Sequence, residues 1–278
     1  MRILSIIVFF AAFFYACDEP VTLDLRQTPS KIVIEGLVTD AEGYQFVKIS
    51  RTVGFYATGT TPRVTDAQVL VKDDLGNEYP FVHNPRSHID SAGIYVPEFP
   101  FTGEIGRTYT LNVTVGETLY AAEDKLLPVI PVDSLNYRFS EEEAEDPKDP
   151  GKVYELLLFA REPQDEANYY LFKFYRNGAL TYYDETDIYY SDDKFLAENI
   201  DGIASPVYYA IQDTGRVEAY SMSRAGYIYY GDLFSLLNND GGGMFGSIPG
   251  SPRTNLSNGA LGFFQVSAIK SKEIILKE

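Results

Sequence analysis

The chain has 278 residues, of which 40 are acidic and 23 are Lys or Arg, so its formal net charge is −17. Binding to nucleic acid or to an anionic membrane surface needs clustered cations, and this balance therefore disfavours both as partners. The 22 Tyr and 18 Phe far outnumber the 3 Met, and Trp is absent. Aromatic side chains fit half-buried pleated surfaces, which indicates a mainly β protein.

The first residues have the pattern of an export signal. Arg2 precedes an apolar run over residues 3–16, in which Ser5 is the only polar residue and Ala16 is small. A basic start, a short apolar run and a small residue at the cleavage position are typical of secretory signals. The run is shorter than the ~20 apolar residues that a membrane-spanning helix needs. We therefore predict that residues 1–16 are a signal peptide.

Cys17, the only cysteine, directly follows this predicted signal. Phe14-Tyr15-Ala16-Cys17 resembles the bacterial lipobox, which would make Cys17 the lipidated first residue of the mature protein. A lone free thiol is unusual in an exported protein, because such thiols pair or react in oxidising compartments. The alternative is a free cysteine in an uncleaved anchor. Residues 17–30 lack periodicity and are predicted to be a tether between the lipid and the fold.

Residues 31–131 form a series of short predicted strands. Ile32, Ile34 and Val38 share one face of the first, and residues 73–77 have the composition of a hairpin turn. Residues 108–115 alternate apolar and polar side chains, which predicts a strand with one buried face. Such strands over about 100 residues predict an immunoglobulin-like or transthyretin-like sandwich.

Pro128 and Pro131 follow this region, and because proline is excluded from central strands we place a domain boundary there. Residues 132–278 are predicted to be a β-rich domain with one short helix. An aromatic and leucine stripe at helical spacing from Tyr227 to Leu237 predicts the helix, with Ser223 at its start and a stop at residues 238–241. The acidic residues 140–151 are predicted to be a solvated loop and lack the ligand offsets of a calcium site.

Residues that carry common catalytic chemistry are sparse. The two histidines, His83 and His88, lie near a predicted turn, and no G-x-S-x-G motif is present. Two histidines five residues apart are too few for a zinc site. A pair of carboxylates for glycoside hydrolysis stays open, since the sequence does not give their separation. We predict no catalytic residue, no cofactor and no metal.

Acids and tyrosines interleave between Tyr182 and Asp193. They could bind a cation or stack on sugar rings, but such a stretch is more often a strand pair with aromatics in the core and acids in water. The absence of tryptophan further disfavours carbohydrate binding.

Several stretches together resemble an uncharacterised family of Bacteroidota outer-membrane lipoproteins, assigned to a domain of unknown function and often encoded beside TonB-dependent receptors. The resemblance is carried by residues 17–20, 34–40, 64–69, 106–111, 165–170, 245–252 and 255–264. It implies a role in receptor-dependent uptake and no catalytic residue. Asp18 and Glu19 resemble the surface-export signal of these bacteria, which implies display on the cell surface.

The sequence therefore predicts a non-enzymatic, lipid-anchored protein of the outer membrane that is an accessory or ligand-binding component of TonB-dependent uptake. Two alternatives stay open: a surface hydrolase acting on glycans or peptides, and a structural interaction lipoprotein of an outer-membrane assembly. Because loops carry recognition on β scaffolds, we expect Arg253 and Asn255 to contact a partner such as the receptor. Both are predicted to be exposed, so changing them should leave stability nearly unchanged.

Overall fold

A computed structural model describes residues 29–54, 57, 59–84, 91–163, 167–196, 198–239 and 250–278. The predicted signal peptide, Cys17, Asp18 and Glu19 lie outside the described residues. The fold is mainly β, with 49% of residues in strands and 10% in helices, as predicted. In the part of the chain that the structure describes, no helix is both long and apolar enough to span a membrane.

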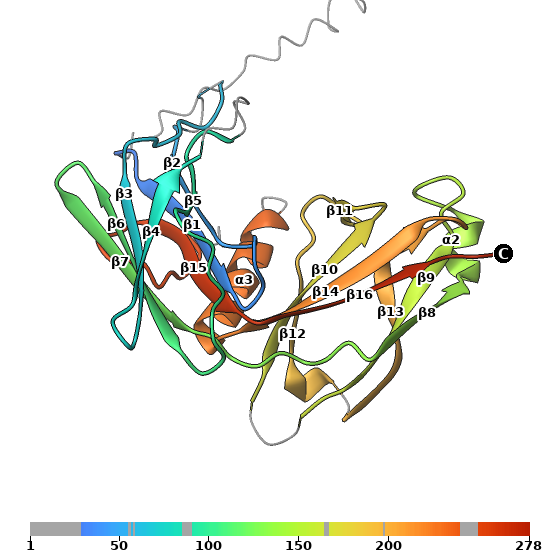
Figure 1. The fold of residues 1–278 in the computed structure, drawn as a ribbon. Coiled ribbons are helices and arrows are strands. Elements are labelled where there is room, and N and C mark those ends of the chain that lie inside the picture. The colour runs from blue at the N-terminus through green and yellow to red at the C-terminus, as the bar shows by residue number, and fades with distance from the viewer. Residues whose placement is uncertain are drawn as a thin grey trace, which may run out of the picture.

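The first body of the fold is a mixed sheet of eight strands that nearly closes on itself (Figure 1). The strands follow the order β15-β1-β2-β5-β4-β3-β6-β7, and only β15 runs parallel to its neighbour. Their bounds are β1 (Ile32–Thr39), β2 (Phe46–Arg51), β3 (Gln68–Asp73), β4 (Glu78–His83), β5 (Ile94–Pro97), β6 (Thr108–Val115), β7 (Thr118–Lys125) and β15 (Leu261–Ser267).

This body differs from the predicted two-sheet sandwich. The alternation of residues gives each strand one buried face, as in β6, where Tyr109, Leu111 and Val113 are buried. The buried faces meet around one shared core because the sheet curls, and alternation alone does not distinguish a curled sheet from two stacked ones. The sheet also contains β15, which lies far outside the predicted segment 31–131.

Close packing of β15 on β1 depends on a glycine. Gly262 pairs with Ile34 in the parallel register. Its φ is +95°, and a Cβ at this position would collide with the carbonyl oxygen of Ile34. Only glycine adopts this φ readily and has no Cβ to collide, so Gly262 allows β15 to pair with β1.

Side chains close the seam between β15 and β7. Asp124 Oδ2 accepts a hydrogen bond of 2.9 Å from the Val266 amide. The Asn255 side-chain amide donates to the carbonyl oxygens of Glu123 (3.1 Å) and Phe264 (2.8 Å). Its oxygen accepts from the Phe264 amide at 3.0 Å. The two strands are thus joined by a carboxylate and an amide.

The second body consists of two antiparallel sheets packed face to face. One has the order β13-β9-β8; the other has the order β11-β10-β14-β16, with β12 also paired to β10. Their bounds are β8 (Ser134–Phe139), β9 (Tyr154–Arg161), β13 (Asn199–Tyr209), β10 (Tyr169–Arg176), β11 (Ala179–Thr181), β12 (Tyr189–Asp192), β14 (Thr214–Met222) and β16 (Ile269–Ile275).

A single residue joins the two bodies at the end of the chain. β15 ends at Ser267 and β16 begins at Ile269, so Ala268 alone separates a strand of the first body from a strand of the second. The backbone of Ala268 bonds Ser221 of β14 twice, with its carbonyl accepting from the Ser221 amide (3.0 Å) and its amide donating to Ser221 Oγ (2.9 Å). The last two strands therefore run from one body into the other and join them (Figure 1).

The helix predicted from the aromatic stripe is confirmed as α3 (Arg224–Leu237), with Ser223 Oγ accepting from the Gly226 amide at 3.2 Å. A second short helix, α2 (Glu141–Glu145), occurs where a solvated loop was predicted. Its N-cap, Ser140, accepts from the Glu143 amide at 3.3 Å, and Glu143 is buried. A 3₁₀ turn, η3 (Asp193–Phe195), follows β12.

Candidate functional site

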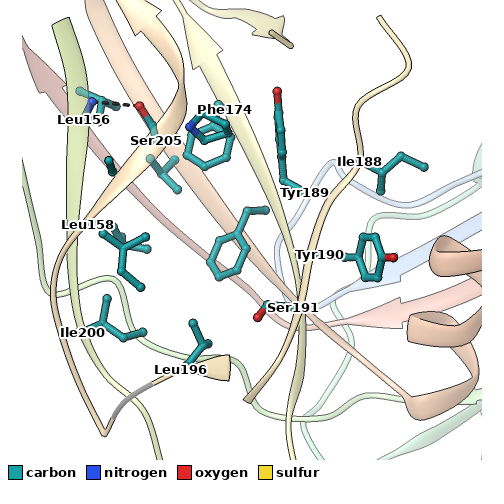
Figure 2. Close-up of a pocket in the computed structure, with 15 residues that line it drawn as sticks. Leu156, Leu158, Phe174, Ile188, Tyr189, Tyr190, Ser191, Leu196, Ile200 and Ser205 are labelled. Atoms are coloured by element: carbon teal, nitrogen blue, oxygen red, sulfur yellow. Dashed lines mark hydrogen bonds between the residues drawn. The ribbon is translucent and has the colours of Figure 1, made fainter. Parts of the chain in front are cut away.

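An apolar cavity of about 330 Å³ lies between the two sheets of the second body (Figure 2). Leu156, Leu158 and Ile200 form one side, and Phe174 and Tyr189 lie across from them. We call this space the inter-sheet cavity; it is lined by Leu156, Leu158, Phe172, Phe174, Ile188, Tyr189, Tyr190, Ser191, Leu196, Ile200, Ile203, Ala204, Ser205, Pro206 and Val217.

An irregular stretch of β13 shapes one wall. Its pairing with β9 shifts register between Ala204 and Tyr208, so that three residues of β13 oppose Leu156 alone. Pro206 in this stretch has no amide hydrogen for a ladder bond. Ser205 Oγ accepts from the Leu156 amide at 2.9 Å and donates to the Val207 carbonyl at 2.7 Å, replacing the missing ladder bonds. The bulge thereby bends the strand at the cavity.

Two consecutive tyrosines form part of the opposite wall. The Tyr189 hydroxyl donates to Asp187 at 2.9 Å and accepts from the Tyr183 amide at 2.9 Å. Burial raises the Tyr189 pKa above its usual range, so this phenol stays neutral. The Tyr190 ring packs edge-on against Tyr227 of α3, with ring centroids 5.3 Å apart. The wall is therefore held both by hydrogen bonds and by the helix.

The chemistry of the inter-sheet cavity suits an apolar ligand. Among its described lining residues, polar side-chain atoms come only from Ser191, Ser205, Tyr189 and Tyr190. Ile203 is 46% exposed, which opens the cavity to solvent at β13. Small-molecule sites are mostly apolar with a few convergent polar groups and span ~300–1,000 Å³. The cavity therefore fits a small apolar molecule or the apolar part of a larger one.

A second space of about 420 Å³, the charged cavity, is lined by Glu143, Lys148, Asp149, Arg176 and Asp184 among others. Asp149 pairs with Lys152 at 3.2 Å and with Arg176 at 3.0 Å, and Lys148 pairs with Asp184. The hydrogen bond from Lys152 and that from Arg176 lower the Asp149 pKa. The two cations thus favour the ionised form of Asp149.

Of the two predicted contact residues, Arg253 is exposed and Asn255 is half-buried. Arg253 is exposed but forms a two-pronged ion pair with Asp232 of α3, at 2.7 and 2.8 Å. Asn255 is half-buried, and its amide closes the β7–β15 seam as described above. The expectation that the Asn255 side chain is freely exposed is therefore wrong, and we now expect its loss to lower stability, because it satisfies three backbone groups. Arg253 retains an exposed surface for a partner.

His83 has a structural contact. Its Nε2 accepts from the Gly93 amide at 3.1 Å, which fixes the end of β4 beside the start of β5. His88 and the glycines at 241–243 lie outside the described residues. Across the described ranges no cluster of three or more His, Cys, Asp or Glu side chains has the geometry to hold a metal ion.

A match to the family described as a domain of unknown function (DUF4249) extends over residues 18–273, which is most of the chain. The chain belongs to this family. The expected membership in a family with a domain of unknown function is thereby confirmed, and no curated protein matches the chain. The description of the DUF4249 family assigns it no activity, so any function must be argued from the geometry.

The inter-sheet cavity of this DUF4249 chain was not foreseen from the sequence. Tyr182 to Asp193 was interpreted as core aromatics with hydrated acids. Tyr189 and Tyr190 are partly buried, but Tyr182 and Tyr183 are exposed and Asp192 is buried as the cap of η3, so the expectation is wrong at these positions. Their position on a cavity wall depends on β13, which is remote in sequence. The one local signal was the Ser205-Pro206 pair, since a proline within a paired strand often marks a bulge.

Proposed function

We propose that this protein is a ligand-binding lipoprotein of the outer-membrane surface that serves TonB-dependent uptake and holds an apolar ligand in the inter-sheet cavity. The observation that carries the ligand-binding part is the apolar lining between two rigid sheets, interrupted by four hydroxyl-bearing side chains. A cavity so lined stabilises an apolar ligand by removing its surface from water. No chemical step is part of the proposal.

The location rests on the N-terminal sequence. Cys17 would carry the acyl chains, and Asp18 and Glu19 would direct the protein to the cell surface. A diacylated or triacylated cysteine anchors stably because each buried methylene contributes ~0.8 kcal/mol, whereas one acyl chain is marginal. The strongly acidic fold would then stand off the membrane rather than lie on it.

The charged cavity is the place where a hydrolase would be sought. A general acid for glycoside hydrolysis needs a raised pKa. The Asp149 pKa is lowered, and its two cationic partners hold it in the ionised form. This arrangement supports a structural ion-pair cluster around Asp149 rather than a general acid at this residue.

Ligand binding can be tested with the uncharged fluorescent probe N-phenyl-1-naphthylamine and the purified mature protein. We expect saturable fluorescence enhancement in the wild type. Ala204→Phe places a ring in the inter-sheet cavity and should abolish most of this enhancement. Ala179→Phe, which adds the same ring to the exposed edge strand β11, is the matched control and should bind as the wild type does. Equal binding by both variants would remove the cavity from the proposal.

The link to uptake needs a separate test in cells. The tagged wild-type protein should co-purify with a TonB-dependent receptor from detergent-solubilised outer membranes. Arg253→Ala should weaken this co-purification, because the exposed guanidinium lies on the surface expected to meet the partner. If the wild type recovers no receptor, the uptake role fails while the binding of an apolar ligand stands independently.

A further inference from the structure

A third space, the junction cavity, lies where the two bodies meet. It has a volume of about 540 Å³ and is lined by residues of α3, of β1 and β15 in the eight-stranded sheet, and of β10 in the second body. Most of its wall is apolar, including the stacked pair Tyr229 and Phe263, whose ring centroids are 5.0 Å apart, and Leu233. Ligand sites occur preferentially at such interfaces between bodies.

Lys173 of β10 brings a cation into this apolar wall. Its Nζ lies 4.4 Å from the centre of the Tyr220 ring. Among the described residues no carboxylate lies within ion-pairing distance of this Nζ, and no hydrogen-bond acceptor contacts it. Burial lowers the Lys173 pKa, which reflects the free energy lost when an ammonium leaves water without a full partner.

The nearest candidate partner, Glu218, is already occupied. Glu218 lies opposite Lys173 in the β10–β14 register and is fully buried. Its two oxygens accept hydrogen bonds from Tyr44 (2.9 Å), Tyr175 (2.9 Å) and Tyr220 (2.7 Å), and its Oε1 forms an ion pair with Arg216 at 3.1 Å. The carboxylate opposite Lys173 thus already has three phenol donors and a guanidinium as its ion-pair partner.

The charges around the junction cavity do not balance. The other charged lining residue, Glu35, pairs with Lys48 at 3.2 Å. Glu218 pairs with Arg216. Each of these two acids thus has a cationic partner of its own. Lys173 has none among the described residues and is the one positive charge in excess within this group. The charge of Glu218 and the Tyr220 ring act on this cation without forming an ion pair with it.

We propose that the junction cavity binds a long-chain carboxylate, with its headgroup on Lys173 and its chain along the aromatic and leucine wall. A carboxylate carries the single negative charge that balances the cavity, whereas a phosphate monoester carries nearly two. The pairing restores an ion pair to a half-buried ammonium, and the apolar wall takes the chain. The site is distinct from the inter-sheet cavity and does not depend on it.

Calorimetric titration of the purified mature protein with decanoate and with decanol separates the headgroup from the chain. We expect decanoate to bind at least about tenfold more tightly than decanol, as a charge-assisted hydrogen bond implies. Lys173→Met keeps the aliphatic stem and should lower decanoate affinity by about tenfold while leaving decanol unchanged. Lys272→Met, an equal charge change on exposed β16, is the control and should have no effect.

A second variant decides the matter if Lys173→Met does not fold. Glu35→Gln removes a partly exposed acid from the cavity wall, so decanoate should bind more tightly than to the wild type. Unchanged or weaker binding would overturn the proposal, as would equal affinities for decanoate and decanol. Loss of decanoate binding in Ala204→Phe but not in Lys173→Met would place the carboxylate in the inter-sheet cavity. That result would reject the junction site and leave the proposed function standing.

Discussion

Asp124, at the β7–β15 seam, is predicted to make the protein less stable as the pH rises. The side chain is 7% exposed, and burial raises its pKa from 3.8 to about 6, against the opposing hydrogen bonds from the Val266 amide and the Ser223 hydroxyl. The folded state therefore binds a proton more tightly than the unfolded chain. Between these two pKa values the free energy of unfolding must fall with rising pH.

The size of this effect follows from the shift. About two pKa units at 1.36 kcal/mol per unit correspond to about 3 kcal/mol, fully present below pH 3.8 and lost above pH 6. Asp124→Asn removes the charge and keeps an oxygen that can accept from the Val266 amide. Part of this contribution is already lost at pH 4, so the unfolding free energy of the variant minus that of the wild type should rise by about 2.4 kcal/mol from pH 4 to pH 7.

Urea denaturation of both proteins across this pH range measures the difference. A changed hydrogen bond in the variant would shift its unfolding free energy by the same amount at every pH. Only the change of the difference with pH is interpreted, so such a shift has no effect on the result. Asp73→Asn in the β3–β4 hairpin is a control of opposite sign. Despite desolvation, hydrogen bonds from Asn77 and its neighbours lower the Asp73 pKa below 3.8, so this difference should fall as the pH rises towards 4 and stay nearly level from pH 4 to pH 7. Parallel pH profiles for wild type and Asp124→Asn would refute the reasoning about the buried carboxylate.

Three further predictions test the seam and the anchor. Asn255→Ala should lower the free energy of unfolding by about 2–3 kcal/mol, because three partly buried hydrogen bonds are lost. Arg253→Ala should leave this free energy nearly unchanged, and urea denaturation measures both variants. Cys17→Ala should abolish acylation and release the chain from membranes, and an unmodified Cys17 in the intact mass of the native membrane-bound protein would contradict this. Protease added to intact cells should digest the wild type and spare a periplasmic marker, and exchange of Asp18 and Glu19 for Ala should protect the protein.

Local features of the fold could be predicted from the sequence. The β3–β4 hairpin at residues 73–77 and the alternation of β6 follow from turn chemistry and a period of two. The helix α3 follows from its stripe and its Ser223 cap. The missed helix α2 also had a signal, since Ser140 and Glu143 have the spacing of a capping box, which the dense acidic composition obscured.

Pairings between remote segments could not be predicted in this way. An alternating strand shows which of its faces is buried but not which strand it pairs with. The pairing of β15 with β1 joins residues more than 200 positions apart, and the collision that a Cβ at Gly262 would cause exists only once the strands have met. The predicted boundary near Pro131 does fall between β7 and β8, yet the chain returns across it to complete the first sheet.

The charged cavity and the junction cavity differ in which bodies supply the partners of their charged residues. In the charged cavity Lys148 pairs with Asp184 and Arg176 pairs with Asp149, and all four residues belong to the second body. At the junction, by contrast, Tyr44 from the turn after β1 reaches Glu218 in β14 and occupies one of its oxygens. Tyr175, Tyr220 and Arg216, all from the second body, contact the same carboxylate. An anion on Lys173 in the junction cavity would contact residues of both bodies, so its binding would stabilise their mutual arrangement.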